Sequence, residues 1–67
     1  MMRVTANGRE VHLDEGITLE GFLRARRLDP RFVIVERNGE ALERGRYGDT
    51  TLADGDRLEV VRAVAGG

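Results

Sequence analysis

The sequence contains no cysteine, which excludes disulfides, thiolate metal sites, cysteine nucleophiles and a persulfide carried on a side chain. Lysine is also absent, because all 11 basic residues are arginines. The chain therefore has no side-chain amine for an isopeptide bond. It could donate its own C-terminus, but lysine-linked chains cannot be built on it. With no serine and a single histidine, the chain cannot assemble a nucleophile with its base, so we do not expect an enzyme.

Aromatic residues are few, and the positive and negative charges nearly balance. Phe22, Phe32 and Tyr47 are the only aromatic residues, too few to line an enclosed small-molecule site. The net charge of -1 provides none of the basic excess that binding to a phosphate backbone needs. There is no long apolar run and no charged leader followed by an apolar segment. We therefore expect a cytoplasmic protein with no nucleic-acid or membrane partner.

The size of the chain allows one small domain. Its 67 residues are near the lower limit for a fold supported by a hydrophobic core alone, and 40% apolar content excludes general disorder. No repeat, low-complexity tract or linker divides it. We expect a single domain over residues 1–67, with a flexible tail at residues 65–67.

The first half of the sequence predicts a hairpin followed by a helix. Asn7-Gly8 joins two short segments and favours the positive φ angles of a two-residue hairpin turn. On the second segment Val11 and Leu13 should face the core. Apolar spacing then predicts one helix over residues 18–28, with Thr18 as its N-cap and its end before the only proline.

The second half predicts two further strands. Residues 32–35 form a run of β-formers without alternation, which indicates a central strand covered on both faces over part of its length. Another Asn-Gly turn follows, and residues 44–51 read as irregular structure anchored by Tyr47. The last strand is expected at residues 57–64, with Leu58 and Val60 facing the helix and Val61 facing away.

The polar residues within the chain are better explained by structure than by chemistry. His12 lies opposite an apolar pair on its strand and is interpreted as a surface residue without a role. Asp54 and Asp56 flank a glycine without further oxygen ligands, so they indicate a turn and not a calcium loop. We predict no metal site and no cofactor bound by this chain.

The chain end differs from the rest of the sequence. Ala65, Gly66 and Gly67 follow an apolar strand directly. Because glycine lacks a Cβ, such a tail can thread a narrow channel that a side chain would block. The pattern suggests a tethered substrate, although a Gly-Gly end alone also fits a frayed terminus.

The combination of these features resembles the thiamine-pathway sulfur-carrier family, ThiS, over the whole chain. The most specific parts are the early Asn-Gly turn, the strand and turn at residues 33–39, the Leu-x-Asp-Gly-Asp turn at residues 52–56, and the end at residues 64–67. Relatives commonly have tryptophan where this chain has Tyr47. That difference leaves the branch of the superfamily open, since related carriers serve molybdopterin synthesis, tRNA thiolation and cysteine synthesis.

The resemblance implies an α+β fold of the β-grasp (ubiquitin-like) type. In that fold a mixed sheet of four to five strands wraps around one helix, and the first and last strands pair in parallel at the centre. It also implies that a ThiF-like enzyme uses Mg-ATP to adenylate the Gly67 carboxylate. Sulfur from a cysteine desulfurase relay then gives a thiocarboxylate, which a ThiG-like thiazole synthase consumes.

Strand parity adds a second candidate site. Ile34 has the opposite parity to its buried neighbours, so it could lie beside Val61 in one exposed apolar patch that docks a partner. The alternative is that the segment around Tyr47 covers both residues. Other functions that stay open are a ubiquitin-like protein modifier and a plain protein-interaction module.

Overall fold

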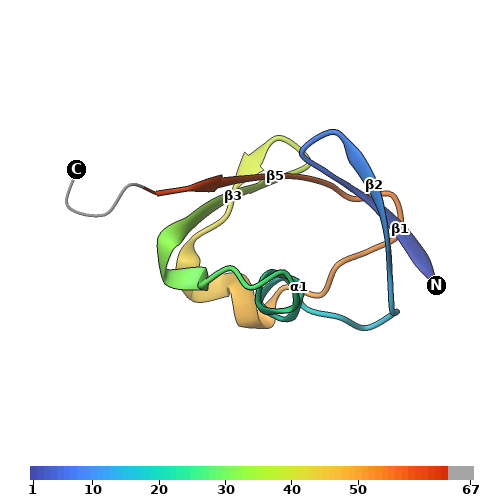
Figure 1. The fold of residues 1–67 in the computed structure, drawn as a ribbon, viewed down its shortest axis with the longest axis horizontal. Helices are drawn as coiled ribbons and strands as arrows, with labels where there is room; N and C mark the ends of the chain where they lie inside the picture. Colours follow the sequence, from blue (N-terminus) through green and yellow to red (C-terminus); the bar gives the residue numbers. More distant parts are fainter. Residues whose placement is uncertain (64–67) are drawn as a thin grey trace.

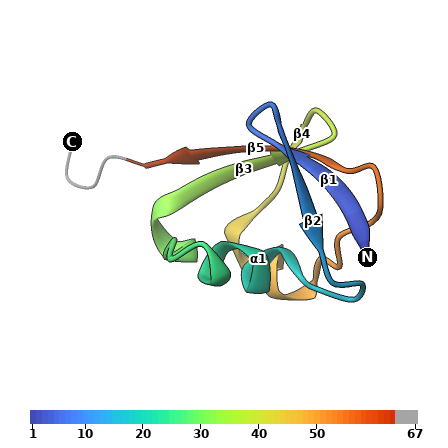
Figure 2. The ribbon, with the colours of Figure 1, turned by 45° about the vertical axis from the view of Figure 1, so that its right-hand side comes forward.

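The computed structural model describes residues 1–63, which form a five-stranded sheet with one α-helix against one face (Figures 1 and 2). The elements in chain order are β1 (Met2–Ala6), β2 (Arg9–Leu13), α1 (Leu19–Ala25), η1 (Pro30–Phe32), β3 (Val33–Arg37), β4 (Glu40–Ala41), η2 (Arg44–Asp49) and β5 (Arg57–Arg62). The strand order is β2-β1-β5-β3-β4. Because β1 and β5 pair in parallel and the other pairs are antiparallel, the predicted mixed β-grasp sheet is confirmed.

The two Asn-Gly turns have the predicted geometry. Asn7 and Gly8 have φ angles of 50° and 82°, and Asn38 and Gly39 have φ angles of 53° and 86°. Consecutive positive φ angles are those of a type I′ turn, whose twist matches that of the flanking strands. These turns create the β1–β2 and β3–β4 hairpins and so position both neighbours of β5.

The helix begins where the sequence predicts and ends earlier. The Thr18 side chain accepts a hydrogen bond of 3.0 Å from the Gly21 N–H, as an N-cap does. The helix stops at Ala25 instead of continuing to residue 28, because Arg27 adopts a φ of 61° and the Leu28 N–H donates to the Leu23 carbonyl. This is a Schellman ending formed without glycine, so the sequence lacked its usual signal.

The core lies between the helix and the inner face of the sheet. The buried apolar side chains are Met2, Val4, Leu19, Phe22, Leu23, Val33, Val35, Tyr47, Leu52 and Leu58. Val11, Leu13 and Val60 pack against this cluster while half-buried, as their predicted parity requires. No helix within residues 1–63 is long and apolar enough to cross a membrane.

The prediction that the strand at residues 32–35 is covered on both faces over part of its length is wrong. Phe32 belongs to η1, and Ile34 on β3 is 50% exposed. The reason is that α1 covers only the inner face of the sheet, while the side chain of Ile34 points to the outer face. The apolar run at residues 32–35 therefore contains buried side chains, Val33 and Val35, and an outward one, Ile34.

Residues 44–51 are more regular than predicted, since Arg44–Asp49 form the 3₁₀-helix η2. Tyr47 is its buried anchor, 2% exposed. Its hydroxyl donates to the Val33 carbonyl and accepts from the Val35 N–H, both at 3.2 Å. The Tyr47 hydroxyl therefore occupies the edge of β3 where β4 does not reach, and the predicted anchoring is confirmed.

Tyr47→Phe should lower the free energy of unfolding by about 1–3 kcal/mol, because it leaves two buried backbone groups of β3 without a partner. Urea denaturation followed by circular dichroism measures the loss. Tyr47→Leu, which also removes ring volume, should cost more. An unchanged urea midpoint in Tyr47→Phe would contradict the role given to the hydroxyl.

Candidate functional site

The predicted tail residues Ala65, Gly66 and Gly67 lie outside the described residues. The structure instead shows how the chain leading to them is held. The Ala63 N–H donates to the Phe32 carbonyl at 2.8 Å, one residue beyond the last β3–β5 pair. In the ribbon views β5 continues past the end of β1 and runs outward from the body of the sheet (Figures 1 and 2).

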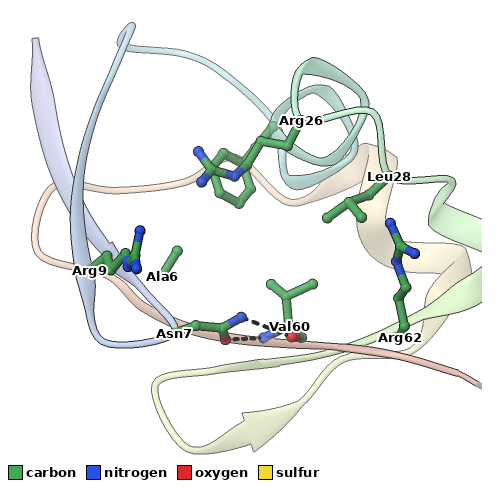
Figure 3. Close-up of a pocket in the computed structure, with 8 residues that line it drawn as sticks. Ala6, Asn7, Arg9, Arg26, Leu28, Val60 and Arg62 are labelled. Carbon is green, nitrogen blue, oxygen red and sulfur yellow. Dashed lines mark hydrogen bonds between the residues drawn. The ribbon is translucent and has the colours of Figure 1, made fainter.

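The strand β5 is held on both sides at its middle. On one side it pairs with β3, with Val35 opposite Val60. On the other side the Asn7 side chain accepts from the Val60 N–H at 2.7 Å and donates to the Val60 carbonyl at 3.0 Å (Figure 3). An amide side chain thus extends the ladder where the backbone of β1 turns away. This contact fixes the direction in which β5 leaves the body.

The start of β5 is fixed by Asp56, which is 6% exposed. Its carboxylate accepts from the Ala53 N–H at 2.8 Å and from the Asn38 amide at 3.0 Å. It also accepts from the Arg37 guanidinium at 3.0 Å. Burial raises the pKa of Asp56, but these three hydrogen bonds lower it by more, so the pKa lies below the usual value.

Ile34 and Val61 lie together, as their parity predicts. They are directly opposite each other on β3 and β5 and are 50% and 59% exposed. Tyr47 is buried on the inner side, so the alternative that its segment covers both residues is wrong. We call Ile34 and Val61 the apolar pair. Its β5 member, Val61, is two residues before Ala63.

A cavity of about 340 Å³ opens on the inner side of β5, beyond the end of α1 (Figure 3). Phe22, Leu28 and Val60 give it an apolar floor, and its remaining lining includes Arg9, Arg26 and Arg62. Arg26 lies over the Phe22 ring, 5.4 Å from its centre. Because no acid, histidine or hydroxyl group lines this cavity, it offers no general base and no nucleophile.

The other polar residues singled out from the sequence, His12 and Asp54, have partners within the fold. His12 is exposed and contacts Glu10 at 3.1 Å, and Asp54 accepts from the Arg3 N–H at 2.7 Å. Within residues 1–63 no group of three or more histidine, cysteine or acidic side chains could hold a metal ion. The sequence predicts Asp56 as a turn residue, and no local pattern indicates its bond to Arg37.

The mixed sheet packs on one helix and pairs its first and last strands in parallel at its centre, which defines a ubiquitin-like β-grasp domain. The model of the ThiS family matches residues 2–67. The chain therefore belongs to the ThiS family, the small sulfur carriers of thiamine biosynthesis.

The sequences and structures of similar proteins support this assignment to the ThiS family. The sulfur carrier protein ThiS of Bacillus subtilis is 40% identical over 63 residues, covering 91% of this chain and 94% of that protein. The crystal structure of ThiS from Geobacter metallireducens has a TM-score of 0.83 at 36% identity, covering 98% of this chain and all of that one. The thiazole synthase of Magnetococcus marinus is 39% identical over 66 residues. This chain spans only 20% of the length of that synthase.

Proposed function

We propose that the Gly67 carboxylate is the sulfur-carrying group of this protein. The observation that carries the proposal is the match to the ThiS family up to residue 67, which includes the Gly66-Gly67 end. The anchoring of β5 supports it, because the point from which the last residues follow is held in the sheet. Ala65 and Gly66 then serve to thread the tail into a partner, since glycine allows close backbone approach.

The chemistry has two stages, activation and sulfur transfer, both catalysed by partners. A carboxylate is a poor electrophile. A ThiF-like enzyme therefore uses Mg-ATP to convert it to an acyl adenylate, releasing pyrophosphate. Persulfide sulfur supplied by a cysteine desulfurase relay attacks the acyl carbon and displaces AMP, which gives an acyl disulfide. A thiol then reduces the S–S bond of this disulfide and releases the thiocarboxylate. This chain is a protein co-substrate in these steps and contributes no catalytic side chain.

The proposed sulfur acceptor is a ThiG-like thiazole synthase. Two thiazole synthases, from Magnetococcus marinus and Paramagnetospirillum magneticum, each contain a segment similar to 98% of this chain. A carrier-like segment within the same chain as the synthase supports a direct transfer between the two. The use of ATP by the activating partner is in keeping with a cytoplasmic location.

The proposal is tested by incubating the protein with a ThiF-like enzyme, Mg-ATP and a sulfur source. Mass spectrometry should show a gain of about 16 Da, as one oxygen is replaced by sulfur in the covalent product. Omission of ATP should abolish the gain. A mass that stays unchanged in the complete mixture would contradict the proposal.

We further propose that the apolar pair docks the activating enzyme. Changing Ile34 or Val61 to Asp should weaken binding by about 1–3 kcal/mol, as loss of a central interface anchor does. Isothermal titration calorimetry measures the affinity. Folding should survive in both variants, because both side chains are exposed. Unchanged affinity in a folded variant would contradict the docking role, and a variant that fails to fold would contradict the outward placement.

A further inference from the structure

Two acidic residues lie beside the apolar pair on the outer face of the sheet. Glu36 on β3 is directly opposite Glu59 on β5. This pair is two positions along the strands from Ile34 and Val61 and is therefore the next pair on the same face. Both glutamates are exposed. Like charges placed directly opposite each other destabilise a sheet. Because this pairing lowers the stability of the sheet, the two glutamates point to a role other than folding.

The cations nearby do not neutralise this pair. Arg37 is next to Glu36 in sequence, but it points to the inner side and binds Asp56. Arg57 shares the outer face with Glu59, yet no ion pair within 4.0 Å involving Glu36, Glu59 or Arg57 occurs among residues 1–63. The two carboxylates are therefore available to a partner.

A hollow of about 490 Å³ adjoins the two glutamates. Glu36 and Glu59 line it together with Asn38, Arg57 and the glycines of two turns, Gly39 and Gly55. A Cβ added at either glycine would meet nothing within 4 Å. There is thus space for a long side chain from a partner to reach both carboxylates.

We propose that this outer face docks a partner surface whose apolar centre meets Ile34 and Val61 and whose arginine or lysine enters between Glu36 and Glu59. This rests on the proposed function, in which that partner is the activating enzyme. Arginine fits best, because its planar fork can donate to two carboxylates at once. A second copy of this chain is a poor occupant, since two such faces would bring four carboxylates together around the apolar pair. The glutamates thus favour a cationic partner and oppose self-association of the exposed apolar pair.

The test compares Glu36→Gln, Glu59→Gln and the double variant with the original chain in calorimetric titrations against the ThiF-like enzyme. Each single change should weaken binding about five- to tenfold and the double change by more, as loss of a charge-assisted pair does. The affinity of the double variant should also depend less on salt. Glu10→Gln is the matched control, an exposed glutamate of the same face on β2, and should bind as the original does.

The fold provides an independent readout. The melting temperature of the double variant should stay equal or rise, because a repulsion is removed, whereas a structural role would lower it. Equal affinity in the double variant, while Ile34→Asp still loses binding, would overturn the proposal and leave the carrier function standing. A dimer of the original chain in analytical ultracentrifugation, dissociated by Val61→Asp, would also overturn it. Failure of the original chain to gain sulfur at all would instead overturn the proposed function.

Discussion

Deletion of Gly67 should abolish thiocarboxylate formation completely. The variant still ends in a carboxylate, that of Gly66, but the reacting carbon lies about 3.5 Å nearer the body of the protein. Because the sheet holds β5 and Ala63 in place, the strand cannot slide to compensate for the missing residue. A displacement of about 1 Å already costs a factor of about 100 in a positioned reaction, so a whole residue should remove the activity.

The same incubation with a ThiF-like enzyme, Mg-ATP and a sulfur source measures this effect by mass spectrometry. Binding affinity for the enzyme should change far less than activity, because the outer face of the sheet is intact in the deletion variant. Glu10→Gln serves as the active control. Sulfur incorporation at the normal rate in the deletion variant would show that Gly67 is not the reacting residue.

Asp56→Ala should cost the fold about 2–4 kcal/mol. Removing the buried carboxylate leaves Arg37, the Asn38 amide and the Ala53 N–H without their acceptor. The range lies below that for a fully buried pair because the Arg37 side chain is 28% exposed. Urea denaturation should show a large shift of the midpoint. Asp54→Ala, which removes only one exposed hydrogen bond, should lose about 1 kcal/mol or less, and equal losses in both variants would contradict the assignment.

The stability that Asp56 provides should depend on pH in a defined direction. Its pKa is lower in the folded chain than the usual value of 3.8. The contribution is therefore complete above the pKa of the unfolded chain, and it is lost as the pH falls through the lower folded value. Urea midpoints measured from pH 7 to pH 2 should fall less steeply at the acid end in Asp56→Asn than in the original chain. Parallel curves would contradict this role.

The parts of the structure that sequence analysis predicted correctly depend on local rules. Asn-Gly favours positive φ angles wherever it occurs, and the period of two residues along a strand places Val61 outward once Leu58 faces the core. Tyr47 was identified as an anchor because no other large side chain is available in its segment. The outward parity of Ile34 was correct for the same reason as that of Val61.

The parts that could not be predicted depend on contacts between distant residues. Asn7 binds Val60 across 53 positions of sequence, and nothing near either residue indicates the contact. The opposition of Glu36 to Glu59 appears only once the β3–β5 register is known. The early end of α1 depends on Arg27, which adopts a conformation that is usually taken by glycine. The helical pattern of the sequence therefore predicts a helix that is too long.

The central claim is that this chain carries sulfur on its Gly67 carboxylate to the forming thiazole. The most direct measurement is a transfer experiment with the protein loaded with ³⁴S, a thiazole synthase and the other substrates of that synthase. We predict that ³⁴S appears in the thiazole product. In the protein the labelled sulfur should be replaced by oxygen, which restores the carboxylate. A labelled protein that keeps its sulfur while unlabelled thiazole forms would contradict the account.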